Sequence, residues 1–183
     1  MTGYIKHVSH GECTVETQRI LYLAYVRSKL EFGSVIWSPY QETYRHDIES
    51  VQKQFVIHLL DSRRNATSFR LAPYRDRCAQ LRLQPLLDRR YVIDALCAFD
   101  IFMGRINDTS INSNFVRLLP PREMRDVNVV AEPSYGTEYL RSQPLAGLRS
   151  IVNNYANQIR FDSKSRFKSF VTEKFATCND ETV

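Results

Sequence analysis

Cysteine and glycine are scarce in this sequence, and those present form no recognisable motif. The 183 residues contain four cysteines, Cys13, Cys78, Cys97 and Cys178, without a C-x-x-C pair. This scatter argues against a zinc ribbon and against a disulfide framework, so we expect a reducing, intracellular compartment. The six glycines form no G-x-G or G-K-S sequence, which argues against a phosphate-binding loop.

The four histidines indicate neither a metal site nor a catalytic group. His7, His10 and Cys13 have an H-x-x-H-x-x-C spacing, but a structural zinc needs a fourth ligand and none follows nearby. His46 and His58 fall on one predicted helix, without an evident grouping with a serine or cysteine nucleophile. We therefore expect no catalytic residues, no metal, no cofactor and no small-molecule substrate.

Long apolar runs are also missing. No segment approaches the ~20 apolar residues that a membrane span requires, and the N-terminal stretch MTGYIKHVSH lacks the apolar core of a signal peptide. Hydrophobic residues still make up 43% of the chain, which is enough for a buried core, and 25% of the residues are charged. The length fits one compact domain or two small helical subdomains, with no membrane partner.

The most strongly patterned stretch predicts a helical hairpin over residues 15–60. The first helix spans about residues 15–30, and Pro39 stops the apolar run that follows it. Its apolar stripe consists of Ile20, Leu23, Val26 and Leu30. We expect Trp37 and Phe55 to be buried together, contributing several kcal/mol at about 25 cal/mol per Å² of apolar area.

The second helix of the hairpin begins near residues 42–44 and continues to residue 60. The residues of its apolar stripe are Ile48, Val51, Phe55 and Leu59. The residues expected to face water are Asp47, Glu49, Gln52 and Lys53. Two helices joined by a short proline-containing turn form an αα-hairpin.

The remaining pattern is also helical, so the expected fold class is all-α: the hairpin followed by a helical bundle. Helices are predicted near residues 74–83, 86–103, 108–119 and 143–159, with a last one capped by Asp162. Residues 122–141 favour at most one short extended segment. In order, we expect a flexible lead-in (1–14), the hairpin (15–60), an arginine-rich loop with central helices (61–119), an extended linker (120–141), C-terminal helices (142–176) and a disordered tail (177–183).

Two details of these helices are specific enough to compare with a structure. The 86–103 helix is apolar on most faces, so we expect it to be buried, to end at Gly104 and to use Cys97 as a small core residue. Thr109 or Ser110 is expected to cap the helix that follows.

Positive charge is concentrated in one segment. Residues 63–90 hold eight arginines, no lysine and two acidic residues, a net charge of +6 in a chain whose total is +5. Arginine makes forked contacts to phosphate or carboxylate. Two interpretations stay open: a surface that contacts phosphates, or a solvated face with internal ion pairs to Asp76 and Asp88.

Three stretches resemble a known family. They are Gly3-Tyr4-Ile5-Lys6, residues 21–40 (LYLAYVRSKLEFGSVIWSPY) and residues 48–55 (IESVQKQF). Their order and residue patterns resemble those of the segment after the catalytic core in reverse transcriptases of non-LTR retrotransposons, especially jockey-like insect elements. The resemblance continues through residues 74–90, which fit the phrase YxxRCxxLxLxxLxxRR, and weakens beyond Asn107. Where relatives carry an arginine before "TNYG", this chain has Glu132.

The resemblance implies a thumb and post-thumb region of an RNA-directed DNA polymerase. Such a region would support template RNA and primer DNA through phosphate contacts without reading bases. Tyr40 and Tyr44, at the tip of the hairpin, would either stack on a base or sugar or pack within the turn. The candidate contacts are Lys53, Arg63, Arg64, Arg70, Arg75, Arg77, Arg89 and Arg90.

The polymerase chemistry itself is not expected in this chain. Reverse transcriptases hold two divalent cations on a Y/F-x-D-D hairpin, and this sequence contains no Asp-Asp pair. We therefore expect no enzyme activity here, and we expect the missing polymerase core as a second partner.

Two alternatives remain open. Beside nucleic-acid binding, the chain could be a stand-alone helical protein-interaction module derived from a retroelement remnant, or a fragment without function whose exposed apolar surface would promote aggregation. Arginines of residues 63–90 gathered on one exposed face would favour nucleic-acid binding, and arginines paired with acids would favour the interaction module.

Overall fold

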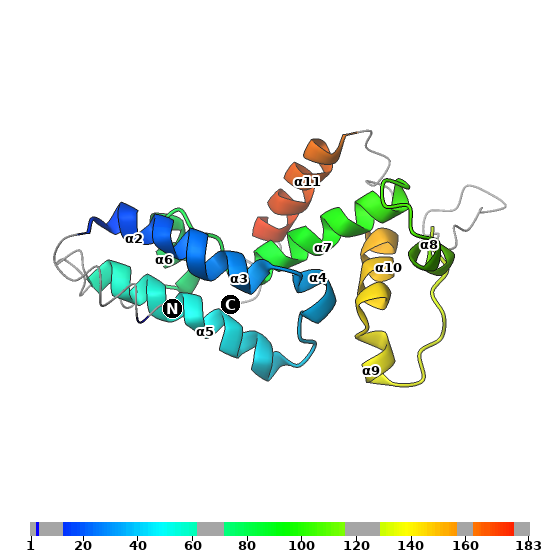
Figure 1. Cartoon of the computed structure of the whole chain (residues 1–183), viewed down its shortest axis with the longest axis horizontal. Coiled ribbons are helices and arrows are strands. Elements are labelled where there is room, and N and C mark those ends of the chain that lie inside the picture. Colours follow the sequence, from blue (N-terminus) through cyan, green and yellow to red (C-terminus); the bar gives the residue numbers. More distant parts are fainter. Residues whose placement is uncertain (1–2, 4–12, 62–71, 116–128, 157–162, 178–183) are drawn as a thin grey trace. The chain divides into compact units, whose positions relative to one another are not determined.

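The computed structural model describes residue 3 and residues 13–61, 72–115, 129–156 and 163–177, with the side chains of residues 175–177 left aside. The described residues are mostly helical, and extended pairing among them is confined to a bridge at Val130 (Figure 1). The prediction of an all-α fold is confirmed. No helix of the described part is long and apolar enough to cross a membrane.

The chain divides into two compact units. Unit 1 comprises residues 1–34 and 38–90, and unit 2 comprises residues 35–37 and 91–183. The division falls within one long helix, α7 (Leu86–Phe102), between Arg90 and Tyr91. The segment 61–119, which we expected to act together, therefore contributes to both units.

Unit 1 contains the predicted hairpin. Its first arm is α2 (Val15–Tyr22), η1 (Leu23–Arg27) and α3 (Ser28–Glu31), and its second arm is α5 (Glu42–Asp61). The arms run antiparallel in Figure 1, and the rings of Tyr22 and Phe55 stack between them with centroids 4.2 Å apart. Stacked aromatic side chains of this kind stabilise a helix pair beyond the burial of their area.

The buried face of the first arm differs from the predicted stripe. Ile20 is 54% exposed, whereas Gln18, Tyr22 and Val26 are buried in a row of positions four apart. The prediction used aliphatic residues alone and missed two buried polar side chains, each of which forms a hydrogen bond within unit 1. Gln18 donates to the carbonyl of Cys13 at 3.3 Å, and the Tyr22 hydroxyl donates to Gln52 at 3.1 Å. A buried polar atom with a hydrogen-bond partner loses little on leaving water.

The prediction for Trp37 is wrong. Phe55 is fully buried, but Trp37 is 41% exposed and belongs to unit 2, as the last residue of the short helix α4 (Ser34–Trp37). The partner of Phe55 is Tyr22 instead. Trp37 lies on a helix of four residues that follows Gly33, whose backbone is in the left-handed region. The apolar pattern did not predict the change of chain direction at this glycine.

A second pair of helices completes unit 1. α6 (Tyr74–Gln80) and the first turn of α7 follow the hairpin, and α6 supplies the buried Cys78, with the buried Leu81 directly after the helix. The buried cluster of this unit consists of Tyr22, Val26, Phe55, Val56, Leu59, Leu60, Cys78, Leu81 and Leu83. Unit 1 therefore has a hydrophobic core of its own.

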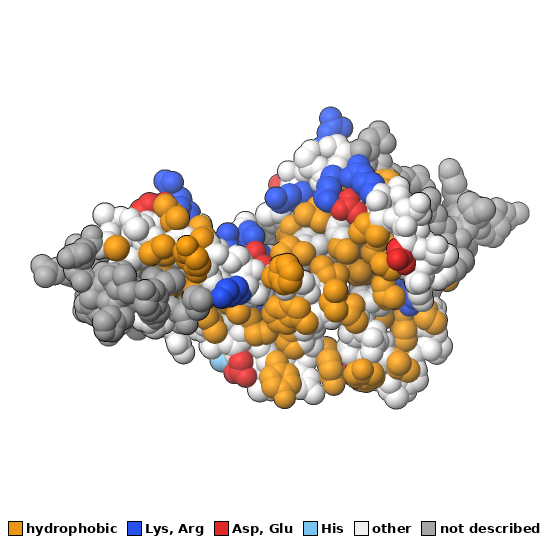
Figure 2. All heavy atoms as spheres, in the orientation of Figure 1, with side chains coloured by type: hydrophobic (Ala, Val, Ile, Leu, Met, Phe, Trp, Pro, Cys, Tyr) orange, Lys and Arg blue, Asp and Glu red, His pale blue; other side chains and the backbone are white. Residues whose placement is uncertain are grey.

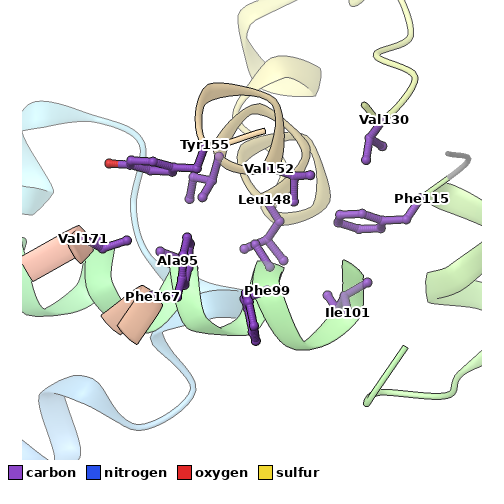
Figure 3. Packing of buried hydrophobic residues seen from close by; sticks show 12 residues of the cluster. Ala95, Phe99, Ile101, Phe115, Val130, Leu148, Val152, Tyr155, Phe167 and Val171 are labelled. Carbon is purple, nitrogen blue, oxygen red and sulfur yellow. The ribbon is translucent and has the colours of Figure 1, made fainter. Parts of the chain in front are cut away.

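Unit 2 is built on the rest of α7, together with α8 (Thr109–Asn114), α9 (Glu138–Arg141), α10 (Pro144–Asn154) and α11 (Lys164–Thr177). Phe99 of α7 stacks on Phe167 of α11 at 5.0 Å. Figure 3 shows side chains of α7, α10 and α11 converging in this core. Its buried residues are Ala95, Ala98, Phe99, Ile101, Phe115, Val130, Leu148, Ile151, Val152, Tyr155, Phe167 and Val171.

The helix boundaries agree with the predictions to different degrees. α7 ends at Phe102 and is followed by Gly104 with φ +71, as its pattern predicted, and Cys97 packs against the core. α8 is capped by Asp108, whose carboxylate accepts from the backbone N–H of Ser110 and Ile111, so the predicted caps at 109 and 110 are wrong. A carboxylate one residue earlier satisfies both free N–H groups, which a hydroxyl does less well. Asp162, the other predicted cap, lies outside the described residues.

An asparagine attaches an extended segment to α10. The amide oxygen of Asn153 accepts from the backbone N–H of Val129 and Val130, at 2.9 and 3.0 Å. Its amide nitrogen donates to the Val130 carbonyl at 3.1 Å and to Glu132 at 2.9 Å. The Asn153 side chain thus ties residues 129–132 to α10, and Glu132 has a structural partner.

Removing this side chain should destabilise unit 2. We expect Asn153→Ala to cost about 1–3 kcal/mol, because two backbone N–H groups beside the fully buried Val130 lose their acceptor. Urea unfolding followed by circular dichroism measures the loss. Asn154→Ala, at the neighbouring exposed position of α10, is the matched control, and equal effects in both variants would contradict the role of Asn153.

Candidate nucleic-acid interface

Five of the eight predicted contact residues lie in the described part of the chain, all in unit 1. Arg63, Arg64 and Arg70 lie outside the described residues, so their candidacy stays a prediction. The described five are Lys53, Arg75, Arg77, Arg89 and Arg90.

Two of these arginines hold carboxylates within the fold. Arg75 donates from Nη2 to Asp88 at 3.0 Å. Arg89 donates through Nε and Nη2 to the two oxygens of Glu31, the Nη2 contact being 2.9 Å, and so joins the start of α7 to the end of α3. Forked contacts of this kind are the strongest that arginine makes with a carboxylate. Arg27 approaches Glu31 as well, at 3.6 Å.

The electrostatics agree with a structural role for these pairs. The hydrogen bonds to Glu31 raise the pKa of Arg89. Burial lowers the pKa of Arg27, and the positive charge of the nearby Arg89 lowers it further. Burial raises the pKa of Asp88, opposed by Arg75. These half-buried ion pairs compensate the charges of their arginines. Less of the positive charge of residues 63–90 is therefore available to an external phosphate.

Two further arginines are buried or half-buried. Arg90 is 3% exposed, and Arg77 is half-buried with its Nε atom inside the fold. A guanidinium in the position of Arg90 cannot reach a phosphate without local unfolding. The side chain of Arg75 is more open than that of Arg89, at 38% against 29% exposure.

Lys53 is placed by an aromatic ring. Its Nζ lies 5.4 Å from the centroid of the Tyr74 ring, a cation–π contact between α5 and α6. The side chain remains half-buried and stays at the surface of unit 1. This geometry is compatible with a phosphate contact.

Behind Lys53 lies a buried polar network centred on Glu49. This carboxylate is 8% exposed and accepts three hydrogen bonds: from the Tyr74 hydroxyl at 2.6 Å and from the backbone N–H of Leu86 and Leu87 at 3.0 Å each. Glu49 therefore caps the N-terminus of α7, where a negative charge is favoured. The prediction that Glu49 faces water is wrong, because free N–H groups of a helix distant in sequence need this acceptor.

Gln52 extends the network and is fully buried, so its predicted exposure is wrong as well. It accepts from Tyr22 and donates to the Tyr74 hydroxyl and to the carbonyl of Gln84, both at 2.9 Å. Burial, supported by Glu49, raises the pKa of both Tyr22 and Tyr74. Both phenols therefore remain protonated donors, and the network fixes α5, α6 and α7 against one another.

An arginine outside the predicted set is the most open one in this segment. Arg82 is exposed and directly follows α6, between the buried Leu81 and Leu83. No carboxylate of the described residues forms an ion pair with it. The sequence signal was available, since an arginine flanked by two core leucines is forced outward, but the candidate set omitted it.

The tip of the hairpin exposes aromatic side chains. Tyr40 and Tyr44 are 42% and 56% exposed, and Arg45 donates to the carbonyl of Pro39 at 2.7 Å, which fixes the turn. On the face shown in Figure 2, Lys and Arg lie in small groups, several of them beside Asp or Glu, while hydrophobic side chains cover wider areas. The face in view is thus not one continuous basic surface.

The described residues offer little for metal or thiol chemistry. No group of three or more His, Cys, Asp or Glu side chains in the described part is placed to hold a metal ion. Burial raises the pKa of both Cys78 and Cys97, which keeps these thiols protonated. His7 and His10 of the H-x-x-H-x-x-C spacing lie outside the described residues.

Comparison with known proteins adds no family to this geometry. A scan against protein-family models, a search of curated proteins and a search of solved structures each found no match.

Proposed function

We propose that this chain is a non-catalytic helical part of a retrotransposon-type RNA-directed DNA polymerase, which supports the template–primer duplex by contacts to its phosphates. The observation that carries the proposal is the ordered resemblance of residues 21–55 to the segment after the polymerase core. These residues lie on the two arms of one helical hairpin and the turn between them. The proposal adds the polymerase core as a second partner.

Not all eight candidate cations suit this function equally well. Arg89 and Arg90 hold the fold or are buried, so removing them would alter stability together with charge. The remaining candidates are Lys53, Arg63, Arg64, Arg70 and Arg75, whose side chain is 38% exposed although it pairs with Asp88. Each phosphate that they neutralise releases condensed counterions, which makes binding weaken with salt by about 0.7–0.9 log units per contact and per log unit of salt.

A matched pair of charge variants tests the proposal. Arg63, Arg64 and Arg70 are replaced by glutamine together, and the control replaces the exposed Arg141, Arg166 and Lys168 of unit 2 by glutamine. Both variants lose the same charge. We expect the first to lower the salt slope of binding to a labelled RNA–DNA duplex by about 2–3, and the control to change it by less than one contact.

Anisotropy across a salt series measures these slopes, and circular dichroism confirms that both variants are folded. Equal losses in the two variants would indicate general attraction to a cationic protein and contradict the assignment to residues 63–70. Folded wild-type protein without salt-sensitive binding would contradict the proposed function itself.

Exposed apolar side chains favour a second candidate function, docking of a protein partner. In unit 1, Phe32 is 84% exposed, and the tyrosines of the turn, Tyr40 and Tyr44, are 42% and 56% exposed. Large apolar side chains at such exposure are typical of protein contact sites. Phe32→Ser would then weaken capture of a polymerase core. Binding to the duplex depends on charge, so it should not change in this variant.

A further inference from the structure

Arg82 occupies a backbone position that normally belongs to glycine. Its φ is +51, in the left-handed region, and among the described residues it is the non-glycine with positive φ. It follows the end of α6 in a Schellman arrangement: the N–H of Leu83 donates to the Cys78 carbonyl and the N–H of Arg82 to the Ala79 carbonyl, both at 2.9 Å. A side chain at this position costs about 1–2 kcal/mol relative to the right-handed conformation.

The surroundings of the turn force this side chain outward. Leu81 and Leu83 are 2% and 4% exposed and hold the turn in the core of unit 1, whereas Arg82 between them is exposed. A glycine would satisfy the same hydrogen bonds without strain. The fold therefore does not require an arginine at this position. Residues held in a strained backbone conformation that the fold does not require are often functional.

The other arginines of residues 72–90 provide the contrast. Arg75 and Arg89 donate to Asp88 and Glu31, Arg77 is half-buried and Arg90 is buried. No described carboxylate pairs with Arg82, so its full charge and its five N–H donors are available to an external anion. Its rigid anchoring on both sides lowers the entropy lost on binding.

We propose that Arg82 is a dedicated phosphate contact of unit 1, which places one nucleic-acid backbone phosphate beside the turn between α6 and α7. The inference rests on the proposed function and adds a residue outside the set that the sequence predicted. The partner class is nucleic acid, because residues 63–90 hold eight arginines against two acidic residues, and the forked guanidinium matches the oxygen atoms of a phosphate.

Three substitutions separate the charge from the strain. Arg82→Gly removes both the charge and the left-handed penalty, Arg82→Gln removes the charge and keeps the penalty, and Arg82→Lys keeps the charge but loses the fork. We expect Gly to raise the thermal midpoint by about 2–4 °C, and Gln and Lys to leave it unchanged. Both Gly and Gln should weaken duplex binding about threefold to tenfold and lower the salt slope by about 0.7–0.9.

The outcomes distinguish this inference from the proposed function. Wild-type protein that fails to bind the duplex overturns both. Wild-type binding that is unchanged by Gly and Gln overturns the assignment to Arg82 and leaves the proposed function standing. A lower midpoint for Gln would show that the arginine serves the fold, and equally strong binding of labelled polyglutamate, lost in the same variants, would show that the anion is a carboxylate; either result overturns the inference.

Discussion

Replacing Glu49 by alanine should lower the free energy of unfolding by about 3–5 kcal/mol, one of the two largest losses that we expect from a single change in this chain. The variant leaves the Tyr74 hydroxyl and the backbone N–H groups of Leu86 and Leu87 without their acceptor. Leu86 is fully buried, so water cannot replace the lost carboxylate there without opening the core. Urea unfolding by circular dichroism measures the loss.

Two further variants test whether the loss comes from the hydrogen bonds that Glu49 accepts. Glu49→Gln should lose less, because its carbonyl oxygen still accepts from Tyr74 and Leu86 while its NH₂ group faces the N–H of Leu87. Asp47→Ala is the control, since Asp47 is an exposed acidic residue on the same helix. Hydrogen exchange should quicken at residues 86 and 87 in the Glu49 variants alone. A loss below about 1 kcal/mol for Glu49→Ala would contradict the role of the network.

The second large effect concerns the core of unit 2. Phe99→Ala should cost about 3–5 kcal/mol, because Phe99 is fully buried and the cavity would lie under the stacked ring of Phe167. Arg105, which lies 5.2 Å from the Phe99 ring centroid, loses its aromatic contact as well. Denaturant unfolding measures the cost, and hydrogen exchange should localise the loss of protection to α10 and α11.

Met103 provides the matched control for Phe99. It follows α7 directly and is 36% exposed, so Met103→Ala removes apolar area without opening a buried cavity and should cost less than about 1 kcal/mol. Similar losses for the two variants would contradict the packing of the core seen in Figure 3.

Helical periodicity predicted which segments are helices and where several of them end. The 86–102 helix, its stop before Gly104 and the pairing of the two hairpin arms follow from spacing that any amphipathic pattern reveals. The predicted faces were less accurate. Gln18, Glu49 and Gln52 are polar by composition and buried in the structure, because each has hydrogen-bond partners that lie far away in sequence or in a turn.

The same limit applies to the candidate interface. A count of arginines cannot show which of them bind carboxylates, and Glu31, the partner of Arg89, lies 58 residues earlier in the chain. The sequence placed Asp88 correctly among the arginines, and Arg75 does pair with it. Arg82 was missed because the prediction used the charges and did not use the two core leucines on either side, which force this side chain outward.

The salt dependence of duplex binding tests the central claim most directly. Wild-type protein is titrated onto a labelled RNA–DNA duplex between about 50 and 200 mM salt, followed by anisotropy. Several phosphate contacts predict a log–log slope of about −2 to −4, with similar affinity for duplexes of unrelated sequence. Folded protein that shows no binding, or binding with a slope near zero, would contradict the claim that this chain supports a template–primer duplex.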